Sequence, residues 1–172
     1  CNYYNNNTNT NCINVRLSNS FGSPVFTENN CWWLVINELC RSAFQKKSIN
    51  ILSDGTPIRD FIHYLDICSA IEKLLLYNSN LPSNIFHISS GETLTIMELA
   101  YSVCSVYKKR YGKEIPVYVK GQNTSVDLQN FQSLKRFTFD ITNIQSIGYK
   151  KTTNINEGIN ELFKYFDRGI LS

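Results

Sequence analysis

Short apolar runs alternate with amphipathic helix patterns along most of this chain. After Asp66, apolar side chains recur at i, i+3, i+4, i+7 and i+8, as in a helix with one buried face. Thr95 and Glu98 have the spacing of a capping box, and Asn154 and Glu157 repeat that spacing before the last helix pattern. Strands that alternate with helices are typical of an α/β fold. The predicted strands cover residues 13–18, 49–52, 58–63, 84–88 and 116–120, and the predicted helices begin near Asn30, Asp66, Thr95 and Asn154.

The first residues differ from the rest of the chain because they are rich in asparagine. Residues 1–12 are predicted to form a loop or frayed segment, and residues 13–172 the folded part. The chain begins at Cys1 rather than Met, and no signal-peptide pattern follows. We therefore expect it to be part of a longer protein.

The composition excludes several classes of partner. The net charge of +3, from 17 basic and 14 acidic residues, is too small to indicate a nucleic-acid partner. No apolar run approaches the roughly 20 residues that span a bilayer, so no membrane partner is expected. The six cysteines form no C-x-x-C pair, which removes the common zinc and redox spacings. Free thiols favour a reducing compartment, and we expect a cytoplasmic protein.

The common catalytic motifs are also missing. The eight glycines are too far apart for a G-x-G phosphate loop, and no tyrosine is followed by a lysine four residues later. Neither H-E-x-x-H nor G-x-S-x-G occurs. Taken alone, the chain has no recognisable set of catalytic residues.

One polar cluster follows the first predicted strand, in the segment Arg16–Gly22. Ligands of open α/β sheets bind where strands end, which makes Asn19 a candidate contact. The alternative is that Asn19 only caps a turn, and the spacing does not decide between the two.

A second cluster extends from Asp54 to Asp66. The turn residues 53–57 separate two apolar runs, which predicts a hairpin-like pair of strands, and Asp66 is predicted to cap the next helix. Arg59 directly follows the turn, and its planar guanidinium suits a diphosphate. A surface ion pair of Arg59 with Asp60 or Asp66 is the alternative, which spacing alone favours.

Four segments, in this order, resemble motifs of the NAD-dependent epimerase/dehydratase family, the extended short-chain dehydrogenases that act on nucleotide sugars. Residues 16–22 are similar to R-x-x-N-x-x-G, 54–66 to G-D-G-x-x-x-R-D-F-I-H-V-x-D, 86–92 to F-N-I-G-S-G-E, and 154–159 to the start of the closing helix. The departures are Ser53 in place of Gly, His87 in place of Asn, and no clear R-x-x-D in residues 121–139, where Arg136 and Asp140 are the candidates.

The resemblance implies a fold and a set of roles. The chain would be the C-terminal portion of an extended Rossmann-type protein, with the last sheet strands and a small α/β substrate-binding domain. The N-terminal half, which binds NAD or NADP and carries the Tyr-x-x-x-Lys pair, would be absent. Asp60 and Asp66 would hold local structure, and His63 would be a packed core histidine. By matching position, Asn19 would contact the substrate near its diphosphate, Asn30 would open a helix at the nucleotide, Arg59 would clamp the diphosphate and Ser18 would lie beside the nicotinamide.

The implied function is the substrate-binding part of an NAD(P)-dependent nucleotide-sugar epimerase or dehydratase, in surface polysaccharide or nucleotide-sugar biosynthesis. Its partner would be a nucleotide-diphosphate sugar, and a homodimer of the full-length protein is compatible with it. Two alternatives stay open: a nucleotide-sugar reductase of the same family, and a non-catalytic binding module that lacks the cofactor half. We also expect the isolated chain to be poorly stable, because its first strand would leave an apolar sheet edge exposed.

Overall fold

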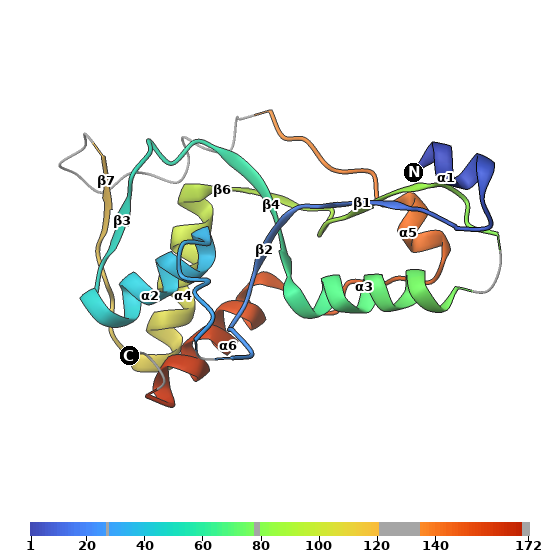
Figure 1. Ribbon diagram of the computed structural model, residues 1–172. Coiled ribbons are helices and arrows are strands. Elements are labelled where there is room, and N and C mark those ends of the chain that lie inside the picture. The colour runs from blue at the N-terminus through green and yellow to red at the C-terminus, as the bar shows by residue number, and fades with distance from the viewer. Residues whose placement is uncertain (27, 78–79, 121–134, 170–172) are drawn as a thin grey trace.

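The structure, a computed structural model, describes residues 1–26, 28–77, 80–120 and 135–169 (Figure 1). It is an α/β fold in which the strands form three small sheets and the helices gather at the two ends of the molecule. The helices are α1 (Asn2–Asn7), α2 (Val35–Lys46), α3 (Tyr64–Leu76), α4 (Ile96–Tyr111), α5 (Thr142–Ser146) and α6 (Ile155–Asp167). The strands are β1 (Asn14–Leu17), β2 (Asn19–Phe21), β3 (Ile49–Ile51), β4 (Ile58–His63), β5 (Ile85–Ile88), β6 (Thr93–Thr95) and β7 (Val117–Val119).

An almost continuous extended segment, β1 followed by β2, passes from one sheet to the next (Figure 1). β1 pairs in parallel with β5, and β2 pairs in parallel with β4. β4 also pairs antiparallel with β6, and β3 pairs in parallel with β7. Ser18 lies at the junction between β1 and β2, so the chain changes partner strand at that residue.

Two separate hydrophobic cores support this arrangement. The larger one lies among α2, α4, α6 and the β3–β7 pair, and the smaller one lies among α3, α5 and β5. The amphipathic helices predicted from the sequence therefore bury the expected faces: Leu99, Ala100 and Val103 of α4 and Ile159, Leu162 and Phe163 of α6 are fully buried.

The predicted starts of the last two long helices are confirmed. In both helices the side chain of the N-cap residue accepts a hydrogen bond from the backbone N–H three residues later. The side chain of the glutamate at that later position accepts a hydrogen bond from the backbone N–H of the N-cap residue. The caps are Thr95 with Glu98 in α4 and Asn154 with Glu157 in α6.

The predicted hairpin does not form. β3 pairs with β7, and β4 lies between β2 and β6. The last four residues of β4 are buried, so pairing on both of its sides gives more burial than a local hairpin would.

Two helix starts also differ from the prediction. α2 begins at Val35, because Asn30 accepts a hydrogen bond from the backbone of Trp32 and forms a local turn instead of a helix cap. α3 begins at Tyr64, with His63 as its N-cap residue, so Asp66 lies inside the first turn and does not cap the helix.

The first residues are more ordered than predicted. Residues 2–7 form the short helix α1, none of whose side chains is buried. The side chain of Asn5 accepts a hydrogen bond from the backbone N–H of Cys12 and donates one to its carbonyl, which holds the following loop against the helix.

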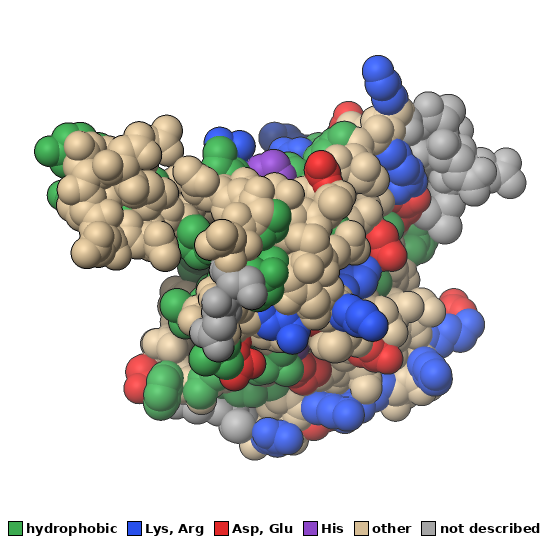
Figure 2. Space-filling model, turned by 90° about the vertical axis from the view of Figure 1, so that its right-hand side faces the viewer, with side chains coloured by type: hydrophobic (Ala, Val, Ile, Leu, Met, Phe, Trp, Pro, Cys, Tyr) green, Lys and Arg blue, Asp and Glu red, His purple; other side chains and the backbone are tan. Residues whose placement is uncertain are grey.

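One edge of the β1–β5 sheet is apolar and exposed, as the sequence predicts. On β1, Val15 and Leu17 are 37% and 52% exposed, and in the described part of the chain this strand pairs with β5 alone. Hydrophobic side chains also reach the surface of the face shown in Figure 2. Among the described residues, no helix combines the length and the apolar character needed to cross a bilayer.

Candidate functional site

Ser18 and Asn19 lie where β1 ends and β2 begins, and both are tied to β4. The Ser18 hydroxyl donates a hydrogen bond of 2.6 Å to a carboxylate oxygen of Asp60. The Asn19 amide donates one of 2.9 Å to the backbone carbonyl of the same residue. Asn19 therefore does more than cap a turn, because it bridges two neighbouring strands.

Arg59 shares a sheet face with Asn19. Asn19 is paired with Phe61 on β4, and Arg59 is paired with Leu94 on β6. Because paired residues point to the same face and side chains alternate along a strand, all four lie on one face of the sheet. The two polar side chains that were predicted to approach one ligand are thus presented together, and both are exposed.

The Arg59 guanidinium has no carboxylate partner in the part of the chain that the structure describes. Its Nη1 donates a hydrogen bond of 2.8 Å to the carbonyl of Ile58. Asp60 and Asp66 are buried and accept hydrogen bonds from other residues, so the surface pair considered as an alternative does not form.

Two small pockets lie in this region of the sheets, and neither Asn19 nor Arg59 is among the residues that line them. The Phe61 pocket, of about 80 Å³, opens on the face that carries Arg59, and the Ser18 pocket, of about 190 Å³, lies at the end of β1. The Phe61 pocket is lined by Phe21, Phe61, Ser90, Glu92, Leu94, Lys151, Thr153 and Ile155. The Ser18 pocket is lined by Arg16, Leu17, Ser18, His87, Ser89 and Phe139.

Both pockets contain polar groups available to a ligand. Ser89 is almost fully buried, and its hydroxyl has no hydrogen-bond partner among the described residues. Arg16 Nη1 lies 3.5 Å from Nε2 of His87 on the paired strand. In the Phe61 pocket, Lys151 Nζ lies 3.1 Å from a carboxylate oxygen of Glu92. Each pocket therefore combines a cation with apolar walls.

Asn30 lies apart from these pockets and lines neither of them. It is exposed, on the connection between β2 and α2. That connection is anchored by the buried amide of Asn37, which accepts a hydrogen bond from the N–H of Gly22 and donates one to its carbonyl. The predicted role of Asn30 as a helix cap is wrong, and its contact with a nucleotide stays a prediction.

Gly22, the last residue of the first motif, can be replaced only with strain. Its φ is +136°, and a Cβ at this position would lie 2.3 Å from Cδ1 of Tyr64 and 2.9 Å from Nε2 of His63. The glycine allows the end of β2 to approach the start of α3 closely.

His63 is a buried side chain at the end of β4. Its ring packs against Phe21 and Tyr64, and Nε2 lies 3.0 Å from a carboxylate oxygen of Glu161 on α6. Burial lowers the pKa of His63, and the negative charges of Glu161 and Asp66 only partly oppose this effect. The predicted core position is confirmed.

Arg136 and Asp140 do not act as a pair. Arg136 lies 2.6 Å from a carboxylate oxygen of Glu98 and donates a second hydrogen bond to the carbonyl of Thr93. Partial burial would raise the pKa of Glu98, but the hydrogen bonds from Arg136 and Thr95 outweigh it and hold the pKa below its usual value. Asp140 accepts a hydrogen bond from the backbone of Thr142 at the start of α5.

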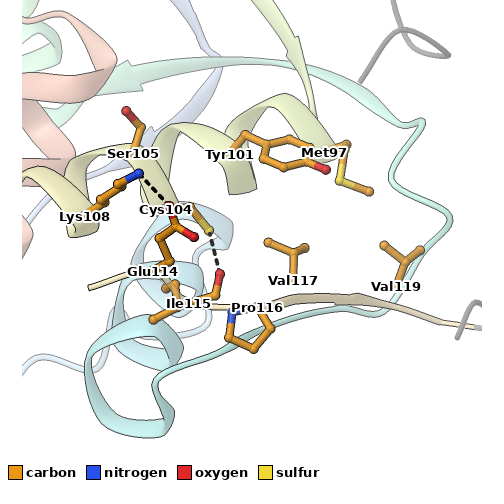
Figure 3. A pocket seen from close by; sticks show the side chains of 10 residues that line it. All are labelled: Met97, Tyr101, Cys104, Ser105, Lys108, Glu114, Ile115, Pro116, Val117 and Val119. Atoms are coloured by element: carbon orange, nitrogen blue, oxygen red, sulfur yellow. Dashed lines mark hydrogen bonds and ion pairs between the residues drawn. The ribbon is translucent and has the colours of Figure 1, made fainter. Parts of the chain in front are cut away.

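A larger, mostly apolar pocket of about 490 Å³ lies between α4 and the chain leading into β7 (Figure 3). Lys108 and Glu114 form an ion pair at its edge. Burial raises the pKa of Cys104 to about 11, so this thiol stays neutral at pH 7 and is a poor nucleophile. None of the residues predicted to bind a ligand lines this pocket, whose apolar lining includes Met97, Val117 and Val119.

The sequence does not predict the hydrogen bonds of two residues at the centre of this region. Asp60, which the resemblance places in local structure, links the first and second motifs through Ser18, and the hydroxyl of Ser90 donates a hydrogen bond to it. Ser90 lies two residues after a predicted strand, where ligand-site residues gather in parallel sheets, and this position is the signal that the sequence offers.

Comparisons with known proteins identify the family of this chain. Residues 1–89 match the model of the NAD dependent epimerase/dehydratase family. The chain is 27% identical over 143 residues to probable GDP-L-fucose synthase 1 of Oryza sativa subsp. japonica, covering 80% of this chain and 40% of that protein. It is also 27% identical over 149 residues to dTDP-L-rhamnose 4-epimerase of Burkholderia thailandensis, covering 86% of this chain and 38% of that protein.

Solved structures show the same fold. UDP-N-acetylglucosamine 4-epimerase from Methanobrevibacter ruminantium M1 superposes with a TM-score of 0.73 at 22% identity, over 98% of this chain and 50% of that one. UDP-glucuronic acid 4-epimerase from Bacillus cereus superposes with a TM-score of 0.65 at 18% identity, over 98% of this chain and 49% of that one. The chain thus spans about 40% of the curated relatives and about half of these structures, and its fold is part of an extended short-chain dehydrogenase. Since the family model covers more than half of its 172 residues, the chain belongs to the NAD-dependent epimerase/dehydratase family.

Proposed function

We propose that this chain is the substrate-binding portion of an NAD(P)-dependent nucleotide-sugar epimerase or dehydratase. The observation that carries the proposal is the shared sheet face of Asn19 and Arg59, which come from segments 40 residues apart in sequence and are both exposed. A guanidinium and a carboxamide on one rigid face suit a diphosphate, which accepts several hydrogen bonds and carries negative charge.

The chain's own residues would act by binding rather than by chemistry. Arg59 would donate a pair of hydrogen bonds to the diphosphate, and Asn19 would hold the substrate beside it. Binding energy from this distant part of the substrate would orient the sugar ring for reaction. The relatives named above act on GDP-, dTDP- and UDP-sugars, so all three nucleotides are reasonable probes.

The Ser18 pocket fits one side of the nicotinamide site of the family's cofactor. Its Ser89 hydroxyl is buried without a partner among the described residues, and Leu17 is half exposed at the free edge of β1. When bound, NAD or NADP takes up or returns hydride at the sugar. Ser18 would contact it, and the phosphates would be held by residues outside this chain, which has no glycine-rich loop.

The wider setting belongs to the same proposal. Surface polysaccharide or nucleotide-sugar biosynthesis would use the product, in a reducing cytoplasm suited to the six free cysteines. A homodimer of the full-length protein would be seen as twice the protomer mass in light scattering.

Titration calorimetry of the full-length protein with UDP, GDP and dTDP tests the proposal. We expect at least one of these nucleotides to bind. Arg59→Ala should weaken its affinity about tenfold or more, because a charged hydrogen bond to the diphosphate is lost. The matched control is Arg168→Ala, which removes an arginine at the end of α6 and should change the affinity by less than about twofold. Equal affinities of wild type and Arg59→Ala for all three nucleotides would reject the assignment.

A further inference from the structure

Asp60 lies between two residues of the candidate site, Arg59 and Phe61, and is fully buried. Its Oδ1 accepts hydrogen bonds from the Ser18 hydroxyl at 2.6 Å and from the Ser90 N–H at 2.9 Å. Its Oδ2 accepts one from the Ser90 hydroxyl at 2.9 Å. The backbone carbonyl of Asp60 accepts the hydrogen bond from Asn19 already described.

This carboxylate has no cationic partner in the described part of the chain. Removing a carboxylate from water costs free energy unless hydrogen bonds replace its hydration. Here three donors do so, all from two serines that lie 42 and 30 residues away in sequence. An apolar side chain of similar size would stabilise the fold as well as this buried carboxylate does. The carboxylate is therefore better explained by the residues that it holds in place.

The two serines belong to different pockets. Ser18 lines the Ser18 pocket, and Ser90 lines the Phe61 pocket on the Arg59 face. Asp60 itself lines neither pocket. Its carboxylate holds one serine of each pocket, and so connects the segments that follow β1 and β5 to β4.

We propose that Asp60 is a positioning residue, which fixes Ser18 and Asn19 relative to Arg59 and so aligns the cofactor side of the site with the diphosphate side. The inference rests on the proposed function for the identity of the ligands. The inference also has a structural part, which does not depend on any ligand: the Asp60 carboxylate holds the segments around Ser18 and Ser90 in place against β4.

The first measurement is amide hydrogen exchange of the full-length protein in the absence of nucleotide. Asp60→Asn keeps the shape of the side chain but replaces one acceptor oxygen by a donor, so two hydroxyl partners compete for fewer acceptor sites. We expect faster exchange at residues 18–21 and at Ser90. Ser18→Ala removes a single contact and should loosen residues 18–21 in the same direction, which keeps the test available if Asp60→Asn does not fold.

Asp66→Asn is the chemically matched control. Asp66 is equally buried and also accepts three hydrogen bonds, from the N–H and hydroxyl of Thr152 and the N–H of Thr153. Asp66→Asn should speed amide hydrogen exchange at residues 152–153 and leave the exchange at residues 18–21 unchanged. Unchanged exchange at residues 18–21 and Ser90 in Asp60→Asn and in Ser18→Ala would overturn the inference.

The second measurement is the affinity for UDP, GDP and dTDP. Asp60→Asn should weaken the best-bound nucleotide about tenfold, whereas Val103→Ala, which loosens the α2–α4–α6 core without touching either pocket, should change it by less than about twofold. The double variant Ser18→Ala/Asp60→Asn should lose less binding free energy than the sum of the two single variants, because both substitutions affect the same Ser18–Asp60 hydrogen bond. An affinity loss no larger than that of Val103→Ala would overturn the positioning role. If the wild-type full-length protein bound none of the three nucleotides, the proposed function would be rejected, and hydrogen exchange would then decide the inference by itself.

Discussion

The His63 ring is enclosed by residues from three parts of the chain: Phe21 of β2, Tyr64 of α3, and Glu161 of α6. Its side chain is completely shielded from solvent, so protonation inside the folded protein requires a charged imidazole in a poorly solvated site. The Glu161 carboxylate, 3.0 Å away, offsets only part of this cost, which is why the pKa lies below the usual value.

A histidine with a lowered pKa makes stability depend on pH. Near and below pH 6.5 the unfolded chain binds more protons at this residue than the folded chain does, so the free energy of unfolding should fall as the pH is lowered through this region. Urea unfolding between pH 8 and pH 5 measures this effect. We expect the free energy of unfolding of His63→Gln to depend less on pH than that of the wild type. His87→Gln, at the only other histidine of the sequence, should keep the wild-type pH dependence. A wild-type slope in His63→Gln would show that other groups cause it.

Helix α6 links the larger core to the candidate site. Its buried face packs against α2 and α4, and Gly158 lets the ring of Phe21 come close to the helix. A Cβ on Gly158 would lie 2.4 Å from Cε2 of Phe21. The helix therefore supports the end of β2, and its own start depends on the Asn154–Glu157 capping box.

The exposed cap of α6 allows a clean test of this helix. Asn154→Ala removes the side-chain acceptor for the N–H of Glu157, and we expect the free energy of unfolding to fall by about 1 kcal/mol. Asn154→Asp keeps an acceptor at the same place and should stay close to wild type. Urea unfolding measures both variants. If both lost the same free energy of unfolding, the capping hydrogen bond would not be the source of the stability.

The two cores are joined by a narrow region, the continuous β1–β2 segment and its partner β4 (Figure 1). On the side of the smaller core, β1 offers backbone groups and apolar side chains at its open edge. In the solved relatives the matched region is about half of a longer chain. Surface of this kind favours pairing with another strand.

We expect the isolated chain to be weakly stable and to self-associate through β1. Leu17→Lys places a charge on the exposed edge and should shift the chain toward monomer in sedimentation velocity at increasing concentration. Leu75→Lys, on a side chain that is 78% exposed on α3, is the control and should leave association unchanged. A monomeric wild-type chain with sharp cooperative unfolding would contradict this expectation.

Local chemistry was sufficient to predict several parts of this fold. The capping boxes of α4 and α6 and the apolar faces of these helices are determined by residues three or four positions apart, so the sequence alone locates them. Asn30 was misassigned for a local reason, since its side chain forms a turn that delays the start of α2. The resemblance to a family, rather than spacing, selected Asn19 and Arg59.

Strand partners and the Asp60 contacts required the tertiary structure. The apolar runs at 49–52 and 58–63 predicted two strands, but their pairing with β7, β2 and β6 depends on segments far along the chain. In the same way, the sequence identifies Asp60 as a charged residue in an apolar strand, without showing which donors would satisfy it. Those donors come from Ser18 and Ser90, and only folding brings residues so distant in sequence within hydrogen-bond distance of one carboxylate.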